Sequence, residues 1–352
     1  MAKIVSIVGA RPQFVKAAPV CRTLKAAHHV ELLIHTGQHY DDNMSAIFFE
    51  ELDIPTPAFN LGIGSGSHGA QTGAMLAGIE PILISERPDW VLIYGDTNST
   101  VAGALAAAKL HIRIAHVEAG LRSFNRGMPE EINRVVADHL ADLLLVPSQT
   151  AVDNLKAEGI THGVHNVGDV MADALAFAVE RASGRAAILD RLGIGERGYL
   201  LATIHRPENT DNPERMRNIL AAFGKIAEPI IFPIHPRTRL ALGKILDRDL
   251  EIGDLKLIEP VGHLDMVRLE QSARMILTDS GGIQKEAYWL RVPCVTLRDE
   301  TEWVETVQAG WNVVVAADSE LIIQAVSTFS PPETHPTLYG DGHAAERIVA
   351  LL

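Results

Sequence analysis

The feature that most constrains the fold is a repeated alternation of short apolar runs with longer stretches of helical spacing, such as residues 98–109 and 282–290. Short apolar runs of this kind are typical of buried strands. Their alternation with helices predicts an α/β fold of parallel sheets with helices on both faces. The runs form two successive series: residues 4–8, 30–35, 90–94, 113–117, 143–146 and 164–167, then residues 199–204, 230–234, 255–258, 275–278, 293–297 and 312–315.

Two series of similar length in a chain of 352 residues predict two such domains. We place the N-terminal domain at residues 1–168 and the C-terminal domain at residues 169–335, with residues 336–352 as a separate tail that ends in a helix. Open parallel sheets bind ligands at the carboxyl ends of their strands. Two such sheets facing each other would form a deep cleft between the domains.

Charge and cysteine usage exclude several classes of function. The formal net charge of −13 opposes a large nucleic-acid footprint, although a small anionic ligand needs only a local cationic pocket. No run of 18 apolar residues predicts a membrane span. The two cysteines, Cys21 and Cys294, provide neither a disulfide framework nor a zinc site, so we expect the reducing cytoplasm as the compartment. None of the 15 histidines has the spacing of a metal motif, and we expect no metal.

The first strand ends in Gly9-Ala10-Arg11-Pro12, and Lys16 follows one turn into the next helix. Cations near a helix N-terminus oppose the helix dipole unless an anion binds there. Arg11 and Lys16 are therefore interpreted as phosphate contacts, with a solvated first turn as the alternative. A literal G-x-G-x-x-G at residues 64–69 follows proline-rich sequence and not the first strand, so we interpret it as a flexible loop.

A second anion site is predicted where the strand at 275–278 leads into Ser280-Gly281-Gly282 and then a helix. Glycines let backbone N–H groups approach phosphate oxygens, and the serine hydroxyl can donate as well. Glu286 lies one turn further on. It could accept hydrogen bonds from ribose hydroxyls or simply complement the helix dipole.

Carboxylates follow two strands of the first domain, Asp96 after residues 90–94 and Glu118 after residues 113–117, and Glu130 opens a later helix. Each has an ordinary alternative: Asp96 as a helix cap, and Glu130 or its neighbour as a surface partner of Arg134. Together they favour a shared acid/base site. In the second domain, His205 and His235 each end a strand beside an arginine, which suits an anionic ligand.

Taken together, these segments resemble the non-hydrolysing UDP-N-acetylglucosamine 2-epimerases. The matching motifs run in family order over almost the whole chain: GARP (9–12), TGQH (36–39), GDT (95–97), HVEAGLR (116–122), PEEINR (129–134), HRPEN (205–209), TDSGGIQ (278–284), RD (298–299) and YGDG (339–342).

The resemblance implies two Rossmann-like domains in a GT-B-like arrangement, a C-terminal helix that returns to the first domain, a homodimer, a UDP-sugar substrate and no added cofactor. It implies catalytic positions at Asp96, Glu118, Glu130 and His205. It implies nucleotide-sugar positions at Arg11, Lys16, Arg134, Ser280, Gly281, Gly282 and Glu286. His235, which ends a strand beside an arginine, is added as a further substrate-binding candidate. The reaction is C2 epimerisation by elimination of UDP to a glycal and its re-addition, which needs an acid/base group on each face of the sugar.

Two departures bear on the substrate. Trp303-Val304 stands where the family commonly has Arg-Pro, and Pro207 replaces the second arginine of His-Arg-Arg-Glu-Asn. The sequence TEWVE at 301–305 is closer to a branch that includes epimerases of UDP-2,3-diacetamido-glucuronate, so both that sugar and UDP-GlcNAc are kept as substrates. A GT-B glycosyltransferase shares the fold but gives no reason for the carboxylates. A hydrolysing epimerase and a non-catalytic nucleotide-sugar binder are the remaining alternatives.

Overall fold

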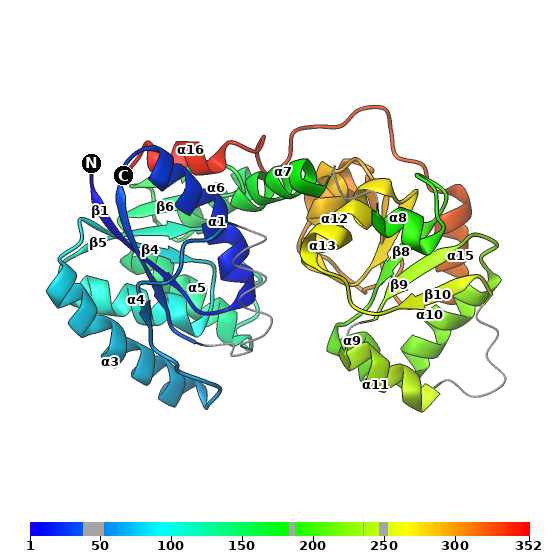
Figure 1. The fold of residues 1–352 in the computed structure, drawn as a ribbon, viewed down its shortest axis with the longest axis horizontal. Helices are drawn as coiled ribbons and strands as arrows, with labels where there is room; N and C mark the ends of the chain where they lie inside the picture. Colours follow the sequence, from blue (N-terminus) through cyan, green and yellow to red (C-terminus); the bar gives the residue numbers. More distant parts are fainter. Residues whose placement is uncertain (38–52, 183–186, 235, 246–252) are drawn as a thin grey trace. The chain divides into compact units, whose positions relative to one another are not determined.

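The computed structural model describes residues 1–37, 53–182, 187–234, 236–245 and 253–352 (Figure 1). The chain divides into two compact units. Unit 1 comprises Met1–Ala176 together with Tyr339–Leu352, and unit 2 comprises Phe177–Leu338. Each unit has a parallel sheet with interleaved helices, which confirms the predicted α/β class. His235, and Gln38 and His39 of the TGQH motif, lie outside the described residues.

The sheet of unit 1 is entirely parallel, and its described strands lie in the order β3-β2-β1-β4-β5-β6-β7. The six predicted strands are all present, each within one residue of its expected limits, because short continuous apolar runs rich in Val, Ile and Leu favour buried strands. Only the two-residue edge strand β3 was not predicted. The strands are β1 (Lys3–Val8), β2 (Val30–His35), β3 (Phe59–Asn60), β4 (Trp90–Tyr94), β5 (Arg113–Val117), β6 (Leu143–Val146) and β7 (Val164–Asn166).

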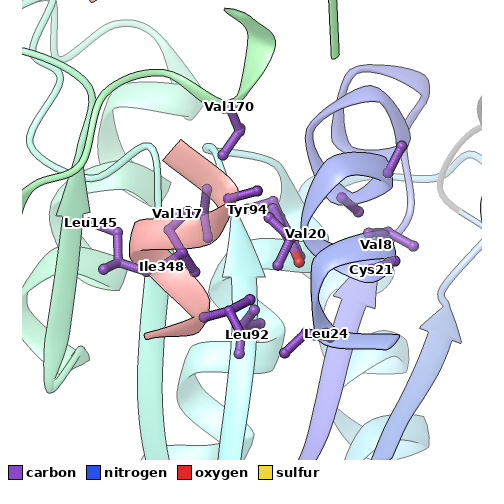
Figure 2. Packing of buried hydrophobic residues seen from close by; sticks show 14 of the residues in the cluster. Val8, Val20, Cys21, Leu24, Leu92, Tyr94, Val117, Leu145, Val170 and Ile348 are labelled. Carbon is purple, nitrogen blue, oxygen red and sulfur yellow. The ribbon is translucent and has the colours of Figure 1, made fainter. Parts of the chain in front are cut away.

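Helices pack on both faces of this sheet. One hydrophobic cluster joins Val20 and Leu24 of α1 to Leu92 and Val117 of the sheet and Ile348 of α16, as Figure 2 shows. A second cluster joins the opposite face to α3 and α4. The helices of unit 1 are α1 (Arg11–Ala26), α3 (His68–Glu86), α4 (Asn98–Lys109), α5 (Pro129–Leu140), α6 (Gln149–Ala157) and α16 (Ala344–Val349).

The last residues of the chain return to unit 1, as the resemblance implied. The Asp173 carboxylate accepts hydrogen bonds from the backbone N–H groups of Ala344 and Ala345, at 3.1 and 2.8 Å. The Trp90 indole donates to the Leu352 carbonyl at 3.2 Å. The split between the units falls inside α7 (Val170–Ala182), whereas the sequence analysis placed the limit at residue 168, before this helix begins.

Unit 2 has its own parallel sheet, whose described strands lie in the order β10-β9-β8-β11-β12-β13. All six predicted strands are present within one residue of their limits. No helix among the described residues is long and apolar enough to span a membrane. The elements are α8 (Ala187–Leu192), β8 (Leu200–Thr203), α9 (Pro207–Thr210), α10 (Pro213–Lys225), β9 (Ile230–Pro233), α11 (Pro236–Ile245), β10 (Leu255–Ile258), α12 (His263–Ser272), β11 (Met275–Thr278), α13 (Gly281–Trp289), β12 (Cys294–Thr296), α14 (Val304–Gln308), β13 (Asn312–Val314) and α15 (Ser319–Thr328).

The glycine-rich stretch at residues 64–69 leads into α3, which begins at His68. Gly69, the last glycine of this stretch, therefore lies in the first helical turn, whereas a flexible loop was predicted for the whole stretch. A Cβ atom added at Gly64, Gly66 or Gly69 would meet no atom within 4 Å among the described residues. No close packing around the stretch requires glycine at these positions.

Candidate active site

The carboxyl ends of β1, β4 and β5 gather four charged side chains of unit 1, Lys16, Asp96, Glu118 and Arg134, which we call the charge cluster. Lys16 Nζ is ion-paired with Glu118 Oε2, and Arg134 Nη2 with Asp96 Oδ2. Neighbouring parallel strands end at the same edge of a sheet, so residues far apart in sequence meet there. The structure thus brings together four of the predicted site residues.

Gly95 makes room for this arrangement. Its φ of +62° lies in the left-handed region that favours glycine. A Cβ atom there would lie 3.2 Å from Lys16 Nζ and 3.3 Å from Glu118 Oε2, so the ion pair occupies the space a side chain would need. Glu118 itself has a φ of +69°, an unusual conformation for a non-glycine residue. The backbone at the ends of β4 and β5 thus leaves room for the ion pair of Lys16 and Glu118.

Burial and neighbouring charge act in opposite directions on the two cations. Burial lowers the pKa of Lys16, but the carboxylates of Glu118 and Asp96 outweigh it and raise the pKa overall. The pKa of Arg134 is likewise raised, because Asp96 and Glu131 outweigh desolvation. Both cations stay charged at neutral pH. Lys16, expected to contact phosphate, is thus held by a carboxylate in this structure.

Glu131, predicted only as a surface partner of Arg134, is a buried partner of that arginine and holds the loop beside the charge cluster. Its carboxylate accepts hydrogen bonds from the backbone N–H groups of Ser123 and Phe124, at 2.9 and 3.0 Å, and from Arg134 Nη1 at 2.6 Å. Burial raises its pKa, but these donors outweigh it and the pKa is lowered. Glu130, the residue predicted as catalytic, is exposed in the first turn of α5.

A buried glutamine shapes the turn between β1 and α1. Gln13 Oε1 accepts from the backbone N–H groups of Gly9 and Ala10, at 2.8 and 3.1 Å, and its amide donates to the Tyr94 carbonyl at 2.8 Å. Gln13 therefore ties the ends of β1 and β4 together. A glutamine at the third helical position is a recognised capping residue, and that was the available sequence signal. The side chain of Arg11 lies outside the described residues.

In unit 2, Asp279 organises the loop that carries His205. Asp279 is fully buried and accepts hydrogen bonds from the backbone N–H groups of His205 and Arg206, each at 3.0 Å, and from Asn209 Nδ2 at 3.0 Å. The His205 side chain is 39% exposed, with Nδ1 3.7 Å from Asp279 Oδ1. The predicted catalytic histidine thus has its backbone fixed and its ring accessible.

The start of α13 has the predicted strand–Ser-Gly-Gly–helix form. Ser280 Oγ caps the helix by accepting from the Ile283 N–H at 3.5 Å. A Cβ atom on Gly281 would lie 2.9 Å from Glu302 Oε1 and 3.1 Å from Trp303 Nε1, so this position is closely packed. A Cβ atom on Gly282 would, among the described residues, have only Ser280 Oγ within 4 Å, at 3.8 Å. At the start of α13, the side chains of Glu302 and Trp303 therefore pack against Gly281.

Two arginines accompany Glu302 at the start of α13. Arg298 Nη1 lies 2.7 Å from Glu302 Oε2, and Arg206 Nη2 lies 3.6 Å from Glu302 Oε1. Burial raises the pKa of Glu302, but hydrogen bonding and both arginines outweigh it and lower the pKa. A helix N-terminus with two arginines is an environment suited to an anion. Sequence reasoning named Arg206 only as a neighbour of His205 and left Arg298 without a role.

The segment that departs from the common family pattern is held in place by Gln284. Gln284 Oε1 accepts from Thr301 Oγ1 at 2.6 Å and from Asn312 Nδ2 at 3.1 Å. Lys285 Nζ lies 4.1 Å from the centre of the Trp303 ring, within the range of a cation–π contact. Trp303 is therefore a fixed part of the surface beside Gly281.

Glu286, expected at the ribose, has a second carboxyl group behind it. Glu270 on α12 is 1% exposed and hydrogen-bonded to Glu286. Burial, and then the charge of Glu286, raise the pKa of Glu270 well above its usual range. The raised pKa favours the protonated form of Glu270, which can donate to the Glu286 carboxylate. Among the described residues, no group of three His, Cys, Asp or Glu side chains is arranged to hold a metal ion.

Comparison with known proteins identifies the relatives of this chain. The family model for UDP-N-acetylglucosamine 2-epimerase matches residues 22–352. A Methanococcus maripaludis protein named UDP-N-acetylglucosamine 2-epimerase homolog is 57% identical over 99% of both chains. The UDP-2,3-diacetamido-2,3-dideoxy-D-glucuronate 2-epimerase of Pseudomonas aeruginosa is 47% identical, again over 99% of both.

The fold is also that of a solved structure. The crystal structure of Methanocaldococcus jannaschii UDP-GlcNAc 2-epimerase, in complex with UDP-GlcNAc and UDP, matches with a TM-score of 0.86. It is 45% identical and covers 99% of each chain. Sequence, family model and structure therefore agree over nearly the full length.

Proposed function

Because the chain belongs to the UDP-N-acetylglucosamine 2-epimerase family, we propose that it interconverts UDP-GlcNAc and UDP-ManNAc by inverting C2 of the sugar. The observation that carries this proposal is the charge cluster, in which Asp96 and Glu118 each face a cation at the strand ends of unit 1. Two carboxylates so placed suit a reaction that moves a proton on and off carbon.

The chemistry explains why elimination is the proposed route. The C2 proton is not next to a carbonyl group, so direct deprotonation would leave an unstabilised carbanion. In the elimination, a base takes the C2 proton, the C–H electron pair forms the C1–C2 double bond, and the C1–O bond breaks with its pair on the UDP oxygen. The same oxygen then attacks C1 of the glycal while C2 accepts a proton on its other face. We assign these proton transfers to Asp96, Glu118, Glu130 and His205.

The departing UDP carries additional negative charge, which the site must stabilise. We assign this role to the start of α13, with Ser280, Gly281 and Gly282, together with the cations Arg11, Lys16 and Arg134, and with His235. Preorganised donors aimed at developing charge typically contribute about 10²–10³ in rate each. Glu286 is proposed to accept hydrogen bonds from the ribose hydroxyls, with its carboxylate oriented by the hydrogen bond to Glu270.

A side-by-side assay in D₂O tests the substrate assignment. We expect UDP-GlcNAc to yield UDP-ManNAc with deuterium at C2, detected by NMR and mass spectrometry. UDP-2,3-diacetamido-2,3-dideoxy-glucuronate is the second candidate, because Trp303 replaces an arginine of the common pattern and is packed against Gly281. Deuterium at C2 only from that sugar would move the assignment to it. No C2 exchange with either sugar would overturn the proposed reaction.

Removing the carboxylates separates catalysis from binding. We expect Asp96→Ala and Glu118→Ala each to lower kcat by about 10²–10⁴-fold, the usual contribution of an acid/base group. UDP affinity, measured by calorimetry, should change little because the proposed diphosphate contacts of unit 2 remain. Asp153→Ala on α6, whose carboxylate accepts from Gln149 at 3.0 Å, is the matched control. Full activity in both test variants would refute the site assignment.

A homodimer is the proposed assembly, and the exposed side of α3 supports this proposal. Its outward side bears Gly73, Ala74, Ala77, Pro81 and Ile84, all exposed and none charged, with Ile84 55% exposed. An uncharged stripe of this length is more typical of a covered surface than of one facing water. Ile84→Glu should shift the mass measured by light scattering from dimer to monomer. A wild-type monomer at all accessible concentrations would exclude the dimer.

The cytoplasm is the proposed compartment. Both cysteines, Cys21 and Cys294, are free and buried. Buried free thiols are compatible with a reducing environment and need no oxidative folding. Fractionation of cells that produce the chain would test the proposal directly.

A further inference from the structure

A fully buried histidine on β5, close in sequence to Glu118, has no role in the function proposed above. His116 is on β5, two residues before Glu118, and its ring is 0% exposed. Its Nδ1 lies 2.7 Å from Asp138 Oδ1 on α5. Its Nε2 lies 2.7 Å from the Gly95 carbonyl oxygen. Both ring nitrogens thus contact oxygen atoms at short hydrogen-bonding distance.

The two partners determine how many protons the ring carries. A backbone carbonyl oxygen can only accept a hydrogen bond, so Nε2 must bear a proton. On the other side, Asp138 Oδ2 accepts from the Gly120 N–H at 3.1 Å and from Arg122 Nη1 at 2.6 Å. These donors favour an ionised carboxylate, which also can only accept, so Nδ1 must bear a proton as well.

The electrostatics of the surrounding groups agree with this count. Burial raises the pKa of Asp138, but the hydrogen bond and charge of His116 and the charge of Arg122 outweigh it and lower the pKa. Arg122 is in turn paired with Glu158, at 2.6 and 2.8 Å. The side chains of Asp138 and Arg122 are buried, whereas Glu158 is exposed, so the Asp138 carboxylate lies between two buried partners, the His116 ring and the Arg122 guanidinium.

Gly95 joins these buried side chains to the charge cluster, because its carbonyl contacts His116 and its Cα lies beside Lys16 and Glu118. Gly95 N–H donates to the Val117 carbonyl at 3.0 Å, and the Gly95 carbonyl accepts from His116. The backbone of Gly95 is thus fixed at both of its polar groups. Asp96 follows directly, with its carbonyl accepting from Asn133 at 3.0 Å and its carboxylate paired with Arg134. The charged groups above the turn are Lys16, Asp96, Glu118 and Arg134.

We propose that His116 is a doubly protonated positioning residue, which locks the Gly95 turn and so fixes the Asp96 carboxylate relative to Glu118. The ring is not itself an acid or base in the reaction, because both of its protons are engaged and solvent does not reach it. Its contribution to turnover rests on the proposed 2-epimerase function, whereas its protonation state does not.

Nitrogen-15 NMR of the full chain labelled at histidine tests the protonation state independently of activity. We expect the His116 ring to show a proton on each nitrogen at neutral pH, because both of its partners accept hydrogen bonds. Asp138→Asn, which keeps an acceptor but removes the ionised carboxylate, should leave one ring nitrogen without a proton. A wild-type ring with one bare nitrogen at neutral pH would overturn the proposal, whether or not the variants fold.

Kinetics test the positioning role. His116→Gln can donate to one partner but not to both, so we expect kcat to fall by about 10²-fold, as a small misplacement of a reacting group does. KM should change by less than about two-fold, since no substrate contact is removed. His139→Gln, one residue beyond Asp138 and exposed, is the matched control and should retain wild-type values. Unchanged kcat in folded His116→Gln would exclude the positioning role. Absence of turnover in the wild type would instead count against the proposed function and leave the NMR result standing.

Discussion

At the scale of single residues, the charge cluster shows how backbone conformation and side-chain chemistry are linked. Gly95 adopts a left-handed conformation, and the space beside its Cα is filled by the ion pair of Lys16 and Glu118. A glycine here serves two purposes, a turn that other residues adopt at a cost and the absence of a side chain. Both purposes can be tested by a single added methyl group.

Gly95→Ala should therefore reduce both stability and activity. The left-handed conformation alone costs an alanine about 1–2 kcal/mol, and the methyl group would displace Lys16 or Glu118 as well. Urea unfolding and steady-state kinetics measure the two effects. Gly64→Ala, where an added Cβ meets no described atom within 4 Å, should leave both unchanged. Equal stability of the two variants would contradict the packing described for Gly95.

At the scale of elements, one buried carboxylate organises each functional loop. Glu131 on α5 holds Ser123 and Phe124, and Asp279 at the end of β11 holds His205 and Arg206. In both cases a charged acceptor satisfies backbone N–H groups that a loop would otherwise leave unpaired. The loops are therefore fixed by the elements beside them and not by their own sequences.

Glu131→Gln should destabilise the chain at neutral pH by about 1.5–3 kcal/mol, the range for hydrogen bonds to a charged group. The folded pKa of Glu131 is lowered, so its contribution is present above the unfolded value of about 4.3 and is lost as the pH falls through the lower folded value. The stability difference between wild type and variant should thus shrink below about pH 4.3. Urea unfolding at a series of pH values measures it, and a difference that grows on acidification would contradict the assignment.

The same elements show which features of the fold and the site can be predicted from the sequence and which cannot. The strands were predicted because continuous apolar runs such as residues 90–94 have few other stable environments. The clustering of Asp96 and Glu118 was expected for the same reason, since parallel strands end together. The role of Asp279 in fixing the His205 loop was not predicted, because its carboxylate accepts hydrogen bonds from residues about 70 positions away in the sequence. The exposure of Glu130 and the burial of Glu131 were not predicted either, because they depend on how the first turn of α5 meets the preceding loop.

At the scale of the whole molecule, unit 1 is completed by the last residues of the chain. Ile348 of α16 is fully buried in the same cluster as α1 and the central strands, as Figure 2 shows. The hydrophobic core of this unit is therefore built from segments more than 300 residues apart in sequence, such as Val8 and Ile348. Unit 1 cannot reach its full stability until the chain is nearly complete.

Ile348→Ala should lower the free energy of unfolding of unit 1 by about 2–5 kcal/mol, the usual range for a fully buried large-to-small change. Hydrogen exchange resolves the effect by element, and protection should fall in β1 and α1 before it falls in β8 or β11 of unit 2. Glu346→Ala on the exposed side of α16 is the matched control. Equal loss of protection in both units would show that they unfold together.

Glu302 has a consequence for any phosphate that binds at the start of α13. Its carboxylate already lies between Arg206 and Arg298 and against Gly281. A diphosphate arriving at this position, as proposed, must displace a resident anion and does not enter an uncompensated cationic pocket. Binding is then an exchange of one anion for another, with a smaller net change in local charge than the ligand alone would bring. The affinity for UDP should depend on salt concentration less steeply than two arginines and a helix N-terminus would suggest.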